Sequence, residues 1–246
     1  RPPAGPPLST IEGDPSGFAS AADREASELL EGAGGAGDPV AAAVGWLLRQ
    51  QDSDGGFGFG WQGGKDPAPV AGRRVAVTAA ATLALAEVAP EAGNRARSRD
   101  ELVGDDEAGL AMRCTASVAR AVAFLVAGAG EEGPLAASTE DHCMAAWAVA
   151  SSMSRLGPRL IAALPKESGI TGEVVERALV AALRRALAAQ DPATGLLSGV
   201  GTGDARRLGT LAFLGFLHEV EPLPAAKAVG ADLRKARSSA SLAVRG

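Results

Sequence analysis

Apolar residues recur at helical spacing along most of the chain, and the intervals between these stretches are rich in glycine, proline and aspartate. Apolar residues spaced three or four apart lie on one side of a helix, whereas glycine and proline end helices. The pattern therefore predicts an all-α protein. The expected helices cover residues 20–31, 39–51, 73–88, 112–126, 140–156, 160–164, 171–190, 204–220 and 225–237.

Local signals define several boundaries between these helices. Asp38-Pro39 has the form of an N-cap followed by proline at the first helical position. Residues 90–107 are polar without steady periodicity, which predicts a loop or a short surface helix. Residues 1–16 hold five of the 15 prolines and predict a flexible leader, so that residues 17–246 would form a single domain.

The helices also form a degenerate repeat of three pairs. Gln51-Asp52 and Gly56-Phe57 in the first pair correspond to Gln190-Asp191 and Gly195-Leu196 in the third. In the middle pair, residues 133–135 take the place of residues 55–57. Each pair would present an amphipathic outer helix and an almost wholly apolar inner helix, which needs neighbours on every side.

The run from Gln51 to Gly58 resembles the repeat of protein prenyltransferases, squalene-hopene cyclases and related α/α-toroid proteins. In that repeat an apolar helix is followed by Gln, Asp-Gly-Gly-aromatic-Gly and a second helix. The resemblance implies a partial or shortened α/α toroid built from antiparallel helix pairs. It also implies an isoprenoid-handling enzyme, and the alternative is a non-catalytic toroid that binds a peptide or protein partner.

Composition restricts the partners. A net charge of -5 without a basic block argues against nucleic acid. The two cysteines, Cys114 and Cys143, cannot form a disulfide framework and fit reduced thiols in a cytoplasmic protein; a single bridge is the alternative. No run is apolar enough to predict a transmembrane segment, and no signal peptide is visible.

The N-termini of the inner helices carry basic residues. Aligning these helices places Arg73 and Arg74 at the first N-terminus, and Arg206 and Arg207 at the third. In a toroid the inner helices run in the same direction, so these N-termini would gather at one opening of the ring. Helix N-termini attract anions and arginines strengthen that attraction, so this opening could bind a diphosphate-like head group; solvated arginines are the alternative. An apolar channel would then be lined by Leu83, Trp147 and Phe213.

The start of the second inner helix carries the most specific motif. Asp141-His142-Cys143 with Trp147 resembles the Asp-x-Cys-x-x-x-Trp motif of prenyltransferase β subunits, which implies Asp141 and Cys143 as candidate zinc ligands. Residues 138–142 also align with the Asp-x-Asp-Asp-Thr motif of terpenoid cyclases. That resemblance implies Glu140 as the catalytic acid, Asp141 as the residue that orients it and His142 as a hydrogen-bond partner. The alternative is that Ser138 caps the helix and Cys143 packs in the core.

A zinc site would need at least one more ligand. His142, Cys114 and His218 are the other His or Cys residues of the chain. His142 adjoins both candidate ligands too closely for tetrahedral coordination. Cys114 is near the start of the outer helix of the same antiparallel pair, so it should lie at the opposite end of the pair from Cys143. His218 lies about three turns further along its helix. We therefore predict no bound zinc, no cofactor and a packing role for Cys143.

Overall fold

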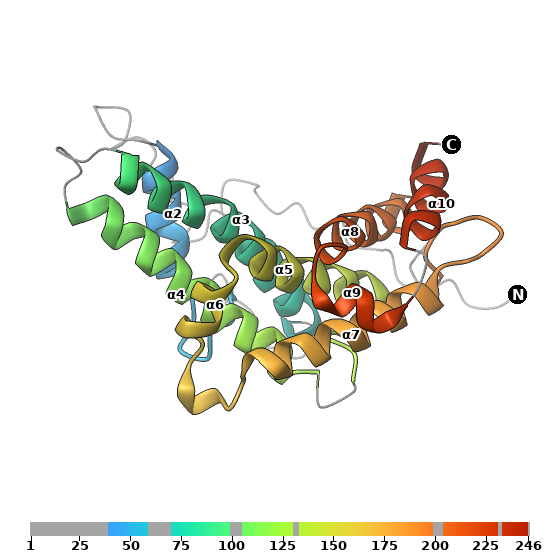
Figure 1. The fold of residues 1–246 in the computed structure, drawn as a ribbon, viewed down its shortest axis with the longest axis horizontal. Helices are drawn as coiled ribbons and strands as arrows, with labels where there is room; N and C mark the ends of the chain where they lie inside the picture. Colours follow the sequence, from blue (N-terminus) through green and yellow to red (C-terminus); the bar gives the residue numbers. More distant parts are fainter. Residues whose placement is uncertain are drawn as a thin grey trace, which may run out of the picture. The chain divides into compact units, whose positions relative to one another are not determined.

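The computed structural model describes residues 39–58, 70–98, 105–129, 133–198, 204–230 and 233–245 (Figure 1). Every regular element in these ranges is helical, which confirms the predicted all-α class. The elements are α2 (Pro39–Arg49), α3 (Val70–Ser98), α4 (Asp105–Ala127), α5 (Thr139–Leu156), α6 (Pro158–Ala163), the 3-10 helix η2 (Lys166–Ser168), α7 (Gly172–Ala189), α8 (Asp204–Val220), α9 (Pro224–Val229) and α10 (Leu233–Arg245).

Contacts divide the chain into two units, Arg1–Trp46 and Leu47–Gly246. The first unit is described only from Pro39, where α2 begins. The predicted leader 1–16 and the predicted helix 20–31 lie outside the described residues. The arrangement described below is that of the second unit.

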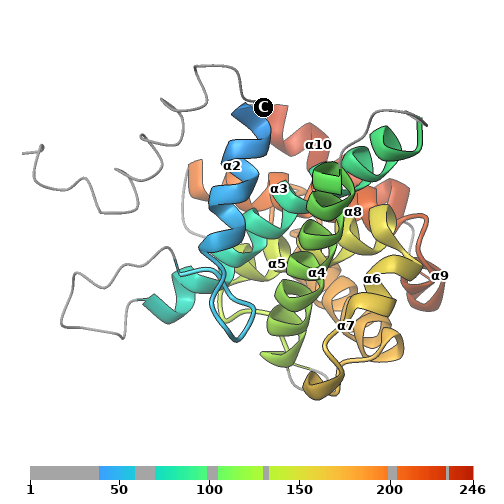
Figure 2. The ribbon, with the colours of Figure 1, turned by 90° about the vertical axis from the view of Figure 1, so that its left-hand side faces the viewer.

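Three helices of the second unit, α3, α5 and α8, form a row in which α5 packs between the other two (Figures 1 and 2). We call these the inner helices. Outside the row, each inner helix packs most extensively against a helix that comes later in the chain: α3 against α4, α5 against α7, and α8 against α10. We call α4, α7 and α10 the outer helices. Inner and outer helices thus alternate along the chain, as the repeat predicts.

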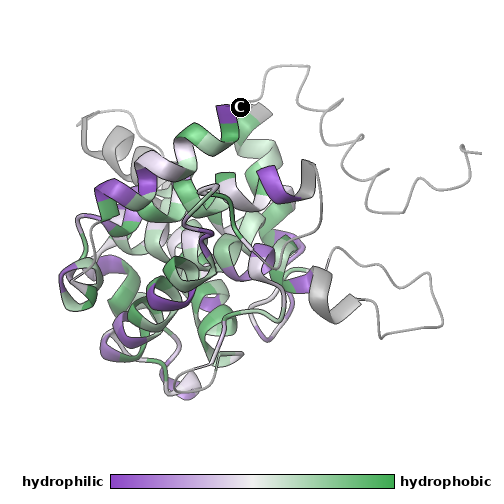
Figure 3. Ribbon diagram, turned by 90° about the vertical axis from the view of Figure 1, so that its right-hand side faces the viewer, coloured by the Kyte–Doolittle hydropathy of each residue, from purple (hydrophilic) through white to green (hydrophobic). Residues whose placement is uncertain are grey.

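Small side chains let the inner helices approach one another closely. Ala145, Ala146, Ala148 and Ala150 of α5 are all fully buried. On α8 the fully buried side chains are larger and include Phe213 and Phe216. Figure 3 shows apolar residues along most of the described helices, with hydrophilic residues interspersed rather than gathered into one block.

Several predicted boundaries are confirmed by their caps. Ser138 caps α5, because its hydroxyl accepts a hydrogen bond from the backbone N–H of Asp141 at 3.0 Å. Thr171 caps α7 by accepting from the N–H of Val174 at 3.4 Å. The predicted helix 204–220 matches α8 at both ends.

Three predicted boundaries are wrong. The helix predicted to begin at Met112 begins at Asp105 as α4. The helix predicted to end at Val88 continues through Pro90 to Ser98 as α3, although residues 90–107 were expected to form a loop or short helix. Proline removes one backbone donor, but the Glu, Ala and Arg residues that follow favour a helix strongly enough to continue it. The single helix predicted over 225–237 is two helices, since Gly230 adopts a left-handed conformation (φ 64°) that ends α9.

One segment of the described chain, Gly109–Ala127 in α4, is long and apolar enough to cross a bilayer. Half of that segment is buried inside the protein. A core helix can have the same length and composition, so the finding carries little weight. The absence of a transmembrane segment stays a prediction.

Candidate functional site

Two turns of the chain share one backbone structure. In the first turn, residues 51–57, the N–H of Asp52 donates to the carbonyl of Gly56 at 2.9 Å, and Gln51 pairs with Phe57. In the third turn, residues 190–197, the N–H of Asp191 donates to the carbonyl of Leu196 at 2.9 Å, and Gln190 pairs with Leu197. The predicted repeat is therefore present, but the predicted register is wrong by one residue. The third turn contains one extra residue, so that Gly195 corresponds to Gly55 and Leu197 to Phe57.

The glutamine of each turn fastens it to the next outer helix. The amide Nε2 of Gln51 donates to the carbonyls of Gly55 and Ser117, both at 2.9 Å. The amide Nε2 of Gln190 donates to the carbonyls of Gly195 at 3.1 Å and Ala236 at 2.9 Å. Ser117 lies in α4 and Ala236 in α10. The same side chain thus makes the same pair of bonds in both repeats.

The last residue of each turn is tied to the inner helix. The N–H of Phe57 donates to the hydroxyl of Thr78 at 2.9 Å, and the N–H of Leu197 donates to the hydroxyl of Thr210 at 3.3 Å. In the middle repeat, the N–H of Leu135 donates to Nδ1 of His142 at 3.1 Å. Thr78, His142 and Thr210 therefore occupy equivalent positions of α3, α5 and α8.

His142 also connects the middle repeat to its outer helix. Its Nε2 lies 3.3 Å from the carbonyl oxygen of Ala182 in α7. The imidazole thus accepts the turn N–H, as a threonine does in the other two repeats, and contacts an outer-helix carbonyl, as a glutamine does there. Burial lowers the pKa of His142, and the positive charge of Arg185 lowers it further, although the bond to Ala182 opposes them. A neutral ring protonated at Nε2 satisfies both contacts.

Arg74, which was predicted to bind an anion, holds the first turn. Its guanidinium donates to Asp52 at 2.7 Å and to both carboxylate oxygens of Asp54 at 2.7 and 2.9 Å. It also lies 4.9 Å from the centre of the Phe124 ring. The bond to Asp54 raises the pKa of Arg74. Burial opposes ionisation of Asp54, but the bonds from Arg74 and from the Gly56 N–H outweigh it and lower the pKa of Asp54.

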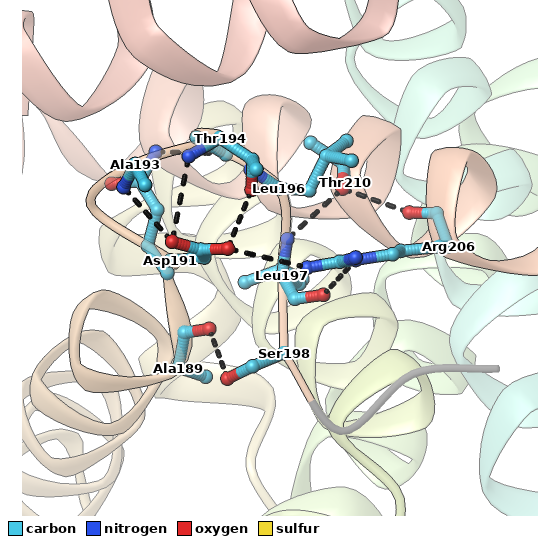
Figure 4. Close-up of polar contacts among 11 residues, drawn as sticks. Ala189, Asp191, Ala193, Thr194, Leu196, Leu197, Ser198, Arg206 and Thr210 are labelled. Carbon is cyan, nitrogen blue, oxygen red and sulfur yellow. Dashed lines mark hydrogen bonds and ion pairs between the residues drawn. The ribbon is translucent and has the colours of Figure 1, made fainter. Parts of the chain in front are cut away.

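Arg206 holds the third turn in the equivalent place (Figure 4). Its Nε donates to the carbonyl of Leu197 at 2.9 Å, and its Nη2 lies 3.7 Å from the carboxylate of Asp191. The side chain of Arg73 lies outside the described residues, and Arg207 is exposed. Arg207 has no hydrogen bond or ion pair with any described residue. The four arginines are thus not shown to form one cluster, and anion binding stays a prediction.

The other predicted catalytic residues lie in the first turn of α5. Glu140 and Asp141 are half-buried, and neither carboxylate has a hydrogen bond or ion pair within the described part of the chain. Their catalytic roles stay predictions. Cys143 is fully buried, and burial raises its pKa to about 12, so its thiol is protonated at neutral pH. The described ranges contain no group of three or more His, Cys, Asp or Glu residues that could hold a metal ion.

A cluster of one arginine and two glutamates joins all three inner helices and was not predicted from the sequence. Nη2 of Arg155 in α5 lies 2.7 Å from the carboxylate of Glu87 in α3 and 3.7 Å from that of Glu219 in α8. Its Nε donates to the hydroxyl of Ser151 at 3.1 Å. Glu87 and Glu219 each lie nine residues after the equivalent threonine. That shared spacing was visible in the sequence, but no signal there indicated an arginine between them.

Trp147 lies on the same side of α5 as Ser151. Its indole packs against Gly215 of α8, where an added Cβ would lie 2.5 Å from the ring. Helical spacing places these groups on the side of the row that faces away from the outer helices. We define this inner face by Trp147, Ser151, Arg155, Glu87 and Glu219.

The predicted apolar channel does not have the expected lining. Leu83 and Trp147 are half-buried at equivalent positions, but Phe213 is fully buried and lies two residues from Gly215, on the opposite side of α8. A surface cavity of about 570 Å³ lies elsewhere, among Ser53, Asp54, Val75, Arg120, Ala123, Phe124, Leu125, Ala127, Gly128, Leu135, Pro165, Glu167 and Ser168. A second, of about 870 Å³, lies along the charged face of α7. Neither is lined by Glu140, Asp141 or Trp147.

The chain was also compared with known proteins. No protein-family model, no curated protein and no solved structure matches it.

Proposed function

We propose that this chain is a non-catalytic helical-repeat protein, a partial α/α toroid, that binds a peptide or protein partner on its inner face. The observation that carries the proposal is the pair formed by Trp147, which is half-buried, and Arg155, whose side chain is 33% exposed, at the centre of three packed helices. Tryptophan and arginine contribute most of the binding energy in many protein interfaces. Helices also hold such side chains more rigidly than loops do.

The remaining polar groups argue for the same reading. Arg74, Arg206 and His142 each hold a turn onto its helices, and Cys143 is a buried thiol. Groups with those partners are poorly placed to bind substrate. On the inner face, two carboxylates surround one guanidinium. That excess of negative charge suits a peptide that carries a basic residue beside an apolar one.

A peptide selection on the wild-type protein tests the proposal. We expect enriched peptides to contain a basic residue and to bind about fivefold more weakly to Glu87→Gln, because an exposed ion pair contributes up to about 1 kcal/mol. Glu176→Gln, an exposed carboxylate on α7, is the matched control and should bind as the wild type does. The proposal fails if no peptide is enriched, or if both variants bind equally well.

A second candidate is an isoprenoid-handling enzyme like the families that the sequence resembles. The observation in its favour is that Glu140 lies seven residues before Trp147, on the same side of α5, with no partner for its carboxylate among the described residues. An acid beside an aromatic ring could protonate an alkene and stabilise the resulting cation. Arg207 would bind the anionic head group.

Calorimetry with farnesyl and geranylgeranyl diphosphate separates the two candidates. The enzyme reading expects binding that Arg207→Ala weakens, and turnover that Glu140→Gln removes without loss of binding. The binding-protein reading expects no heat from either diphosphate. Absence of binding to the wild-type protein would remove the enzyme.

A further inference from the structure

The inner helices can be compared residue by residue, because Thr78, His142 and Thr210 accept the same turn hydrogen bond. Positions counted from these three residues should have the same surroundings wherever the row continues. A position that is buried on two helices and open on the third therefore marks an end of the row. Two stripes of positions behave in this way.

The first stripe is open on α8. It consists of the positions one, four and eight residues after the reference residue, which share one side of a helix. On α3 these are Ala79, Thr82 and Ala86, and on α5 they are Cys143, Ala146 and Ala150; all six are buried. On α8 they are Leu211, Leu214 and His218, of which Leu211 is 46% exposed, Leu214 is half-buried and His218 is exposed. We call these three the α8 stripe.

The second stripe is open on α3. It consists of the positions two, six and ten residues after the reference. On α8 these are Ala212, Phe216 and Val220, all buried, and on α5 they are Met144, Ala148 and Ser152, of which the last two are buried. On α3 they are Ala80, Ala84 and Val88, of which the two alanines are exposed and Val88 is half-buried. We call these three the α3 stripe.

Packing explains the pattern. Since α5 packs on α3 and α8 packs on α5, the first stripe of each helix is the side that faces the next inner helix. The second stripe is the side that faces the previous one. Within the second unit, no described helix follows α8 in the row or precedes α3, so each end leaves one stripe open.

We propose that the α8 stripe of one copy of this chain docks onto the α3 stripe of a second copy, head to tail. The leucines of the α8 stripe are large where Ala80 and Ala84 are small, so that they can interdigitate. Between α5 and α8 within one chain the sizes are the other way round: the first stripe of α5 has small residues, and they face the large Phe216 and Val220 in the second stripe of α8. Docking would also bring His218 level with Glu87, whose side chain is 61% exposed.

The two stripes differ, so the contact is heterologous. Such contacts form closed rings or open chains, depending on the angle between successive copies. Leu208, one turn before the α8 stripe, is 59% exposed and would extend the contact. This interface adjoins the inner face at Glu87, but the leucine contacts that carry it do not depend on what binds to the inner face.

A concentration series by light scattering tests the proposal. We expect the mass of the wild-type protein to rise with concentration, and Leu211→Arg to remain monomeric with an unchanged circular dichroism spectrum. Leu242→Arg is the matched control, because Leu242 is 72% exposed on α10, off both stripes, and should associate as the wild type does. A wild-type protein that stays monomeric at every concentration would overturn the proposal.

Cross-linking tests the geometry. A Leu211→Cys chain mixed with an Ala80→Cys chain should give a cross-linked pair with a short bismaleimide, whereas either chain alone should not. Cys114 and Cys143 are both buried and should contribute little background. Efficient cross-linking of Leu211→Cys to itself would show a symmetric contact and contradict head-to-tail docking.

Discussion

Gly55 lies where the first turn passes closest to α4. Its φ of 92° is in the left-handed region, and an added Cβ would collide with the carbonyl oxygen of Arg120. We expect Gly55→Ala to lower the free energy of unfolding by about 3 kcal/mol, measured by urea denaturation. Gly230→Ala is the control for backbone strain alone, since Gly230 has a φ of 64° but open space around it. It should cost about 1 kcal/mol. Equal losses would mean that α4 moves aside.

His142 should make stability depend on pH. Burial and Arg185 hold its pKa below 6.5 in the folded protein, whereas the unfolded chain can bind a proton normally. The unfolded state therefore binds more protons as pH falls below about 6.5, and the free energy of unfolding decreases. Above that pH His142 is neutral in both the folded and the unfolded state, so it no longer makes the free energy of unfolding depend on pH.

The variant His142→Thr isolates this effect from that of other titrating groups. Threonine is the residue at the two equivalent positions and can accept the N–H of Leu135. Urea denaturation at pH 7.5 and 5.5 should show a smaller loss of stability on acidification for the variant than for the wild type. An equal loss in both proteins would contradict the inference.

At the scale of elements, each turn is joined to an outer helix that lies far along the chain: Gln51 bonds to a residue 66 positions away and Gln190 to a residue 46 positions away. The carbonyl Oε1 of Gln51 also accepts bonds from Ser117 at 2.8 Å and from Arg120 at 2.7 Å. Gln190 has no such additional bond among the described residues. We expect Gln51→Ala to cost about 3 kcal/mol and Gln190→Ala about 2 kcal/mol in urea denaturation. The reverse order would contradict this account.

Local signals predicted most elements, because caps, glycine turns and apolar spacing act within a few residues. Ser138, Thr171 and the ends of α8 are examples. The extension of α3 past Pro90 and the break at Gly230 were missed, since each depends on which of two competing local preferences prevails. Glycine alone does not reveal that it will adopt a left-handed conformation.

The candidate site was predicted less well. Its residues were found as motifs, but their partners lie far along the chain. Arg74 bonds to Asp54 and His142 to Ala182, 20 and 40 residues away. Such contacts arise only when helices pack, so the sequence could not distinguish an arginine that binds a ligand from one that holds a turn. The Glu87–Arg155–Glu219 group was missed for the same reason.

Across the second unit, each repeat contacts mainly its neighbours, so a destabilising substitution in one repeat should mainly destabilise that repeat. In such arrays stability is approximately a sum of repeat and interface terms. Gly195 contacts α10 as Gly55 contacts α4, since an added Cβ would collide with the carbonyl oxygen of Ser239. We expect Gly195→Ala to increase amide hydrogen exchange in α8 and α10, with α3 and α4 close to wild type. Gly55→Ala should give the opposite distribution. An equal increase in every helix for both variants would show that the row opens only as one cooperative unit, which the contacts of Arg155 with α3 and α8 could enforce.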